Sequence, residues 1–179
     1  MSLRDITKDL HTDAERTLFA TKLVTGSLST EEYANYLWQM VLVYNGIEVA
    51  ATSQGMLKNL PDIERTHKIY QDCIELVGPN HQLKWLPVTI DYYQYLLALN
   101  YSNRKHLVKA HLYCRHMGDL FGGQMIAKKV PGQGRFYQFK DPEALKAAIR
   151  AELTDDLGDE ARVAFEWAIK LMKALNTEL

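Results

Sequence analysis

The N-terminal segment places a histidine beside two cations and a carboxylate at helical spacing. His11 follows Arg4 by seven residues and Lys8 by three, and at about 100° per residue the three side chains fall within about 60° of one another. Glu15, one turn further on, can accept a hydrogen bond from the imidazole, which fixes the tautomer of a metal-binding histidine. This flank suits a metal and the carboxylates of a large ligand, although a boundary histidine among surface charges has the same spacing.

Three glycines surround an aspartate in the segment 111–124. Gly118, Gly122 and Gly123 fall within six residues of a helical pattern and forgo about 2 to 3 kcal/mol of helix stability relative to alanine. Close packing between helices explains such a cluster, and so does a helix that ends at Gly118. The functional interpretation is a kinked helix whose bare backbone approaches a flat ligand, with Asp119 ordering water beside it. The sequence leaves these interpretations open.

Two further pairs have the spacing of functional groups. Lys146 and Arg150 are four residues apart and share one helix face, which is a solvated face by default and a carboxylate clamp if it meets an acidic ligand. Glu64 and His67 have the Glu-x-x-His spacing of di-iron bundles, but a second such motif is missing from the sequence.

Periodicity and capping signals predict the helices that position these residues. Apolar residues recur at helical spacing over 3–18, and a capping box of Ser29 and Glu32 opens a long helix that ends near 55–61. Further helices are expected over 61–77, 87–100 and from 103 towards 129. A final pair is expected to begin with Asp141 as the cap and Pro142 at the first helical position, and to turn near 158. Residues 131–134 are the clearest loop, and 136–139 could form a short strand. The sequence therefore predicts a single all-α domain, 1–179, of about six to eight helices.

The composition excludes several classes of protein. The chain has 179 residues, 47% hydrophobic and 24% charged, and its 21 basic and 22 acidic residues give a net charge of -1. Such a balance predicts a packed globule without a nucleic-acid or anionic-membrane partner. Only Cys73 and Cys114 are present, which favours a reducing cytoplasm. Because the first ten residues are too charged for a signal peptide and no stretch of 18 apolar residues exists, a soluble, cytoplasmic protein is expected.

Two segments resemble the haem-binding helices of haem oxygenases. Residues 3–15, LRDITKDLHTDAE, resemble the proximal helix of that family, and residues 113–124, with the core GDLxGG, resemble its distal helix. The order and spacing of the helices also fit, so the resemblance covers essentially the whole chain and is greatest to compact cyanobacterial and cyanophage members. It implies a haem oxygenase-like helical bundle with haem between a proximal and a kinked distal helix.

The resemblance assigns the proximal side of the haem. It implies that His11 is the axial ligand to the iron of haem b and that Glu15 supports it. Ala14 and Phe165 would contact the porphyrin. The groups implied to meet the propionates are Arg4, Lys8, Tyr113, Lys146 and Arg150.

The resemblance also assigns the distal side. Gly118 and Gly122 would lie over the haem, Asp119 would hold the water that delivers protons, and Arg115 would join the same hydrogen-bonding system. Several positions depart from the family pattern, and two of them, Phe121 and Ala168, bear on that water network. The departures are Arg4 for lysine, Cys114 for threonine, His116-Met117 for Tyr-Leu, Phe121 for serine and Ala168 for asparagine.

The activity that the resemblance implies is oxygen- and electron-dependent opening of haem at the α-meso carbon to biliverdin IXα, carbon monoxide and ferrous iron. Electrons would come from ferredoxin or, alternatively, a flavoprotein reductase, and a bilin reductase would take the product. No tightly bound flavin is expected. The alternatives are a haem carrier without turnover, a di-iron oxidase on the same fold, and a plain helical interaction module, which explains neither the histidine flank nor the glycine cluster.

Overall fold

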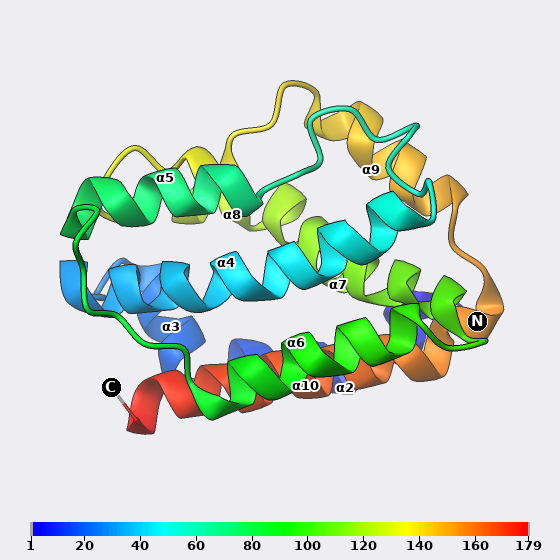
Figure 1. Ribbon diagram of the computed structural model, residues 1–179, viewed down its shortest axis with the longest axis horizontal. Helices are drawn as coiled ribbons and strands as arrows, with labels where there is room; N and C mark the ends of the chain where they lie inside the picture. The colour runs from blue at the N-terminus through cyan, green and yellow to red at the C-terminus, as the bar shows by residue number, and fades with distance from the viewer. Residues whose placement is uncertain (1, 179) are drawn as a thin grey trace.

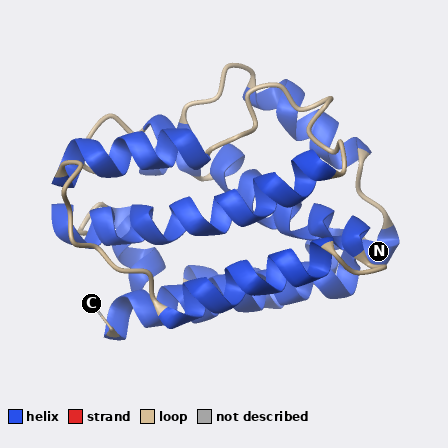
Figure 2. Cartoon of the chain, viewed as in Figure 1, coloured by secondary structure: helices blue, strands red, loops and turns tan. Residues whose placement is uncertain are grey.

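The computed structural model describes residues 2–178, which form one all-α domain. Within those residues there are ten α-helices, three short 3-10 helices and no strand (Figure 2). The α-helices are α1 (Leu3–Ile6), α2 (Lys8–Glu15), α3 (Leu18–Thr25), α4 (Thr30–Ser53), α5 (Thr66–Val77), α6 (Pro87–Asn100), α7 (Val108–Phe121), α8 (Gly123–Ile126), α9 (Pro142–Ala151) and α10 (Gly158–Thr177). The 3-10 helices are η1 (Lys105–Leu107), η2 (Arg135–Tyr137) and η3 (Asp155–Leu157).

Helix α4 runs through the centre of the bundle. It lies between α5 on one side and α6 on the other, and it also packs against α7 (Figure 1). The predicted capping box begins it: the Ser29 N–H donates to Glu32 Oε2 at 2.7 Å, and the Glu32 N–H donates to Ser29 Oγ at 3.1 Å. Because neighbours surround it, α4 buries residues on all its faces, including Tyr33, Leu37 and Tyr44.

The proximal segment is three short helices, so the prediction of one helix over 3–18 was wrong. The breaks fall at two threonines. The Thr7 hydroxyl donates to the Leu3 carbonyl at 2.8 Å, and the Thr17 hydroxyl donates to the Ala14 carbonyl at 2.8 Å while accepting from the Ala20 N–H at 3.3 Å. Threonine hydroxyls compete in this way with the helix hydrogen bonds, and apolar periodicity does not reveal it.

The distal segment is helical through Gly118 and is interrupted at Gly122. Helix α7 ends at Phe121 and α8 begins at Gly123, so the interpretation in which the helix ends at Gly118 was wrong. The Gly122 N–H still donates to the Gly118 carbonyl at 2.8 Å. The glycines therefore produce an interrupted helix, and helical structure stops at Ile126 rather than near residue 129.

Two other boundaries differ from the predictions. Residues 136–139 form no strand: η2 occupies Arg135–Tyr137, where the Phe136 N–H donates to Asp72 Oδ2 of α5 at 2.9 Å. Helix α5 begins at Thr66 rather than near residue 61, because Asp62 adopts a left-handed φ of 64° and the preceding turn is held by buried Arg65. None of the helices described over residues 2–178 is long and apolar enough to cross a membrane.

Candidate active site

Helix α10 holds the proximal and distal segments on one of its faces. The Phe165 ring meets the His11 ring of α2 edge-on at 5.6 Å between centroids, and the Ala161 carbonyl accepts a hydrogen bond from Cys114 Sγ of α7 at 3.5 Å. Residues four apart lie one above the other on a helix. Helix α2, which bears His11, and helix α7 therefore flank the same stretch of α10, although they are about a hundred residues apart in the chain.

His11 and Glu15 form the predicted pair on α2. His11 Nδ1 lies 3.5 Å from Glu15 Oε1, and the His11 side chain is 56% exposed. An acceptor at Nδ1 favours the tautomer in which Nε2 carries the lone pair, which is the state that ligates a metal. Ala14 is buried beside them and Phe165 is half-buried. The imidazole of His11 is therefore accessible, and its contacts with Glu15 and Phe165 set the orientation of the ring.

The cations lie around Tyr113 and Phe121. Burial raises the pKa of the Tyr113 hydroxyl, while the positive charges of Arg150 and Arg4 act on it in the opposite direction, so α1 and α9 both bring a cation to α7. Lys146 Nζ and Arg150 Cζ lie 4.3 Å and 5.4 Å from the centroid of the Phe121 ring. Phe121, which replaces the usual serine, therefore lies beside the two cations of α9 and is 54% exposed. The remaining predicted cation, Lys8, is exposed on α2.

The glycines at the interruption of the distal segment have different surroundings. A Cβ added to Gly123 would lie 2.5 Å from Tyr137 Cδ1, so packing requires glycine at that position. A Cβ on Gly122 would approach only the Gly118 carbonyl oxygen, at 3.3 Å. Gly118 is exposed, and a Cβ there would meet no heavy atom within 4 Å. The fold does not explain Gly118, whereas a flat ligand against the bare backbone does.

Asp119 is a buried carboxyl group directly beyond Gly118. The Tyr44 hydroxyl of α4 donates a hydrogen bond to Asp119 Oδ2. Burial raises the pKa of Asp119 to about 6, and the charge of His116, the bond from Tyr44 and the charge of Arg115 oppose that effect. A carboxyl group poised near neutrality in this position can accept and release a proton.

Arg115, one turn before Asp119, has donors without protein acceptors. Its Nε and Nη2 atoms are buried and have no hydrogen-bond partner among residues 2–178, while its Cζ lies 5.6 Å from the centroid of the Tyr92 ring. Buried guanidinium N–H groups are costly when unpaired. They call for acceptors that a bound ligand or ordered water supplies.

Several polar residues of this region were missed in the sequence. Tyr92 Oη lies 2.8 Å from His111 Nδ1, His111 Nε2 lies 2.9 Å from Glu160 Oε1, and the Tyr95 hydroxyl donates to the same oxygen at 2.5 Å. Tyr92 of α6 is buried in this network. A histidine in an apolar helical pattern, His111, was the available signal.

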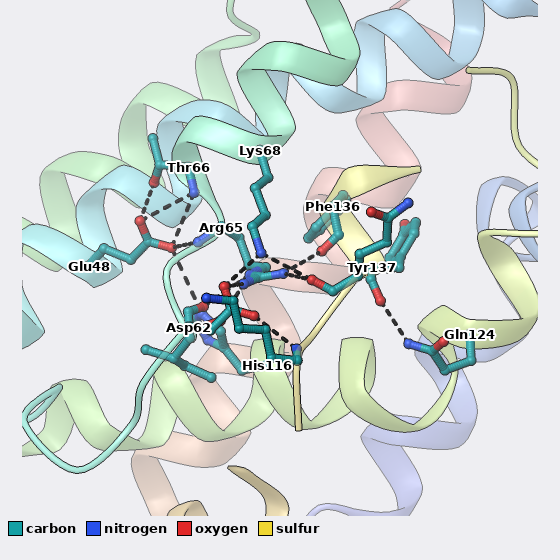
Figure 3. Close-up of polar contacts among 12 residues, drawn as sticks. Glu48, Asp62, Arg65, Thr66, Lys68, His116, Gln124, Phe136 and Tyr137 are labelled. Atoms are coloured by element: carbon teal, nitrogen blue, oxygen red, sulfur yellow. Dashed lines mark hydrogen bonds and ion pairs between the residues drawn. The ribbon is translucent and has the colours of Figure 1, made fainter. Parts of the chain in front are cut away.

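The Arg65 cluster was also missed. Its guanidinium is fully buried and donates to the carbonyls of Ile63 at 3.1 Å and Gln138 at 2.7 Å (Figure 3). Arg65 thereby joins the loop before α5 to the segment around η2, which contacts the interrupted distal helix through Gly123 and Tyr137. No local sequence pattern predicts such a cluster, because its members are about 70 residues apart in the chain.

The residues present fit a haem better than they fit the alternative metal site. His11 supplies an accessible imidazole, Gly118 offers bare backbone beside open space, and Arg115 has unpaired donors. In contrast, Glu64 and His67 are exposed, and Glu64 precedes α5. Within residues 2–178 no three His, Cys, Asp or Glu side chains are grouped as a metal site. The one Glu-x-x-His motif therefore does not support a di-iron centre.

An open groove elsewhere on α2 is a separate feature. Leu10 and Ile169 line its apolar part, and charged groups such as Arg16 and Lys173 line the rest. At about 100° per residue, the α2 residues that face this groove point away from His11. The groove is therefore not the place where the imidazole would meet a ligand.

An all-α bundle in which a histidine-bearing helix and a glycine-interrupted helix flank a common third helix is the architecture of haem-cleaving oxidoreductases. A family model described as "Heme oxygenase" matches residues 1–174. The chain belongs to the haem oxygenase family, whose members are oxidoreductases that cleave haem to biliverdin.

Individual relatives agree with this assignment. The haem oxygenase 1 of Nostoc sp. is 28% identical over 204 residues, covering 99% of this chain and 85% of the relative. The structure of haem oxygenase from Leptospira interrogans matches with a TM-score of 0.83 and 25% identity over 100% of both chains. Haem oxygenase-1 from the cyanobacterium Synechocystis sp. PCC6803, solved in complex with haem, shares the fold with a TM-score of 0.87 and 24% identity over 98% and 91% of the two chains.

Proposed function

We propose that this protein binds haem b between α2 and α7 and opens it at the α-meso carbon to biliverdin IXα, carbon monoxide and ferrous iron. The observation that supports the proposal most strongly is a pair of neighbouring residues on α7. Gly118 is exposed and has open space where a Cβ would be, and Asp119 is buried and hydrogen-bonded to Tyr44. When bound, haem supplies the redox-active iron and is also the substrate. Family membership supports the general reaction, and the position of cleavage is our inference.

Residues of α2 and residues of α7 have different roles in the proposed haem site. On α2, His11 would hold the haem iron through Nε2, while Glu15 orients the imidazole ring. On α7, Asp119 and Arg115 would hold water beside the bound haem, and Asp119 would accept and release protons through its carboxyl group. Gly118 and Gly122 keep that face free of side chains. A haem carrier would need His11 but not a poised carboxyl group behind a glycine.

Electrons must come from outside this chain. The proposed donor is ferredoxin, with a flavoprotein reductase as the alternative, because the curated relatives include cyanobacterial enzymes and we expect no tightly bound flavin here. A bilin reductase is the class of enzyme that would consume biliverdin. We propose a soluble protein of the cytoplasm for this reaction.

The visible spectrum of the protein with one equivalent of haemin tests the function. A Soret band should form, and it should decay in air as a broad biliverdin band grows once ferredoxin, ferredoxin reductase and NADPH are added. A flavoprotein reductase in place of ferredoxin compares the two donors. A Soret band that persists with both donors would favour the carrier, and the failure of any Soret band to form would overturn haem binding.

Alanine at Gly118 should separate folding from haem binding. In the helix interior, Gly118→Ala should raise the free energy of unfolding by about 0.5 to 1 kcal/mol, because the new Cβ meets nothing within 4 Å. The same methyl group would occupy space beside the haem, at a cost of about 1 to 3 kcal/mol, or about 5- to 150-fold in affinity. Urea unfolding and haemin titration measure the two effects.

Gly123→Ala is the matched control for this substitution. Its Cβ would clash with Tyr137, so it should lower the free energy of unfolding by about 1 to 3 kcal/mol. Unchanged haem affinity in Gly118→Ala would show that no ligand lies against that part of α7.

The cations of α9 should control which meso carbon is cleaved. Because Arg150 and Lys146 both lie over Phe121, removing Arg150 or replacing Phe121 with serine should release the clamp that orients the propionates. Loss of a contact worth about 0.5 to 2 kcal/mol would let other biliverdin isomers reach about a tenth of the product or more. Chromatography of the isomers measures this. Lys170→Ala, which removes a cation 4.8 Å from the Trp167 ring, is the control and should leave the isomer ratio unchanged.

A further inference from the structure

His116 is a fully buried histidine on α7, one turn before Asp119. Its Nδ1 lies 3.1 Å from the Leu112 carbonyl oxygen, which can only accept a hydrogen bond. Nδ1 therefore carries a hydrogen in every charge state of the ring. Nε2 is the nitrogen whose protonation distinguishes the neutral imidazole from the cation.

Nε2 of His116 faces a carboxylate. It has no hydrogen-bond partner among residues 2–178, and it lies 3.9 Å from Glu48 Oε1 of α4. Figure 3 shows the two side chains directed toward one another from α7 and α4, with Thr66 above Glu48 and the Arg65 side chain extending to its right toward Phe136. A neutral ring would direct a lone pair at an acceptor in a buried place, whereas the imidazolium directs an N–H at an opposite charge.

Glu48 is held in its ionised form by donors alone. It accepts hydrogen bonds from the backbone N–H groups of Arg65 and Thr66, and from the Thr66 hydroxyl at 2.5 Å. Burial alone would raise the pKa of Glu48, but His116 and these donors outweigh it and lower the pKa below its ordinary range. A buried carboxylate of this kind needs positive partners: Nε2 of His116 lies 3.9 Å from it, and the charge of buried Arg65 also acts on it.

The other side of His116 leads to the proposed proton carrier. The Tyr44 ring packs edge-on against the imidazole at 5.1 Å between centroids, and the Tyr44 hydroxyl donates to Asp119. Burial raises the pKa of Asp119, and the positive charge of His116 is the largest influence that lowers it. The titratable or charged groups around this pair come from four segments: Tyr33, Tyr36, Tyr44 and Glu48 of α4, Arg65 before α5, Arg115 and Asp119 of α7, and Tyr137 of η2.

We propose that His116, as an imidazolium paired with Glu48, is the positioning residue that favours ionised Asp119 and its bond to Tyr44. The catalytic consequence rests on the proposed function, because it requires Asp119 to carry protons in haem cleavage. The pairing itself belongs to the protein without haem.

Carbon-13 NMR of the Asp119 carboxyl group, in the protein without haem, tests the proposal. His116→Asn keeps a donor in the place of Nδ1 but removes the ionisable nitrogen, so the midpoint of the Asp119 titration should move upward from near 6 by about one pH unit. His116→Gln, which can offer Glu48 a neutral N–H, should move it to a similar extent. A midpoint that stays in place in both variants would overturn the proposal, because a structural role does not depend on charge.

Two further measurements keep the test decisive. Nitrogen-15 shifts of His116 in the unaltered protein at pH 7 should report an imidazolium, and a neutral ring would overturn the proposal even if no variant folds. In the haem-loaded His116→Asn enzyme, the acid limb of the pH–turnover profile should move upward with Asp119. A moved Asp119 midpoint with an unmoved profile would support the pairing and count against the catalytic role of Asp119.

Discussion

Replacing His11 with alanine is expected to abolish conversion of haem to biliverdin. The imidazole of His11 is accessible and lies next to Glu15 and Phe165, and we propose its Nε2 atom as the iron ligand. Loss of a group that only supports a metal ligand costs about 10- to 100-fold, so loss of the ligand should cost more than about a hundredfold in turnover. The measurements are the rate of biliverdin formation and the visible and electron paramagnetic resonance spectra of the haem complex.

Chemical rescue sharpens this experiment. Free imidazole added to His11→Ala should restore part of the spectrum, because the substitution removes the side chain without filling its space. His67→Ala is the control: it removes an exposed histidine at the start of α5 and should leave the spectrum and the rate unchanged. If His11→Ala retained the spectrum of the unaltered protein, another residue would have to ligate the iron.

The parts of the fold that could be predicted are those with local signals. The capping box of Ser29 and Glu32 begins α4, and the Asp141 side chain accepts the Ala144 N–H at 3.0 Å at the start of α9, where Pro142 follows it. Both sets of contacts lie within three residues of sequence. Such signals depend little on the rest of the chain, which is why these helix starts were confirmed.

The boundaries that were wrong depend on partners distant in sequence. Residues 135–137 become a 3-10 helix because Asp72 holds the Phe136 N–H and Arg65 binds carbonyls on either side of residue 137. Thr7 and Thr17 are the exception: their hydroxyl groups divide the proximal segment by donating to the carbonyls of Leu3 and Ala14, four and three residues back in the chain. Apolar periodicity indicates which face of a helix is buried, but it does not indicate which backbone groups a side chain will hydrogen-bond.

The candidate site divides in the same way. His11 with Glu15 and the glycines around Asp119 could be proposed from spacing, because each set lies on one short segment. Tyr44 could not, since it bonds to Asp119 from 75 residues away in the chain. The contact of Phe121 with two cations could not be predicted either, because Lys146 and Arg150 come from α9. Tertiary structure is what joins these groups into one polar system.

Replacing Asp119 with alanine should leave haem bound but reduce biliverdin formation by about 100-fold or more. The carboxyl group lies beside the glycine face of α7 and takes its hydrogen bond from Tyr44, so its removal should not disturb His11. General acid–base groups contribute about 10² to 10⁴ in rate. Haemin titration should give a near-normal Soret band, while single-turnover spectra should show little biliverdin. Normal turnover would exclude a proton-transfer role for Asp119.

The pH dependence separates the charge of Asp119 from its shape. With a pKa raised to about 6, the carboxyl group gains a proton as the pH falls through about 6, so turnover that needs the carboxylate should fall there, and Asp119→Asn should be slow at every pH. The pKa of Asp119 is higher in the folded protein than its ordinary value of 3.8, so the protonated group contributes to the free energy of unfolding. This contribution is complete below about pH 3.8 and is lost as the pH rises through about 6.

Asp119→Asn keeps an uncharged group at every pH and should therefore retain this stability. Its free energy of unfolding in urea should exceed that of the unaltered protein by up to about 3 kcal/mol at pH 8, with little difference at pH 4. A variant that is slower in turnover yet more stable at pH 8 would identify Asp119 as a residue kept at a cost in stability for its chemistry. Equal stability of the two proteins at both pH values would mean that burial does not raise the pKa of this carboxyl group, and the pH argument for its role would fail.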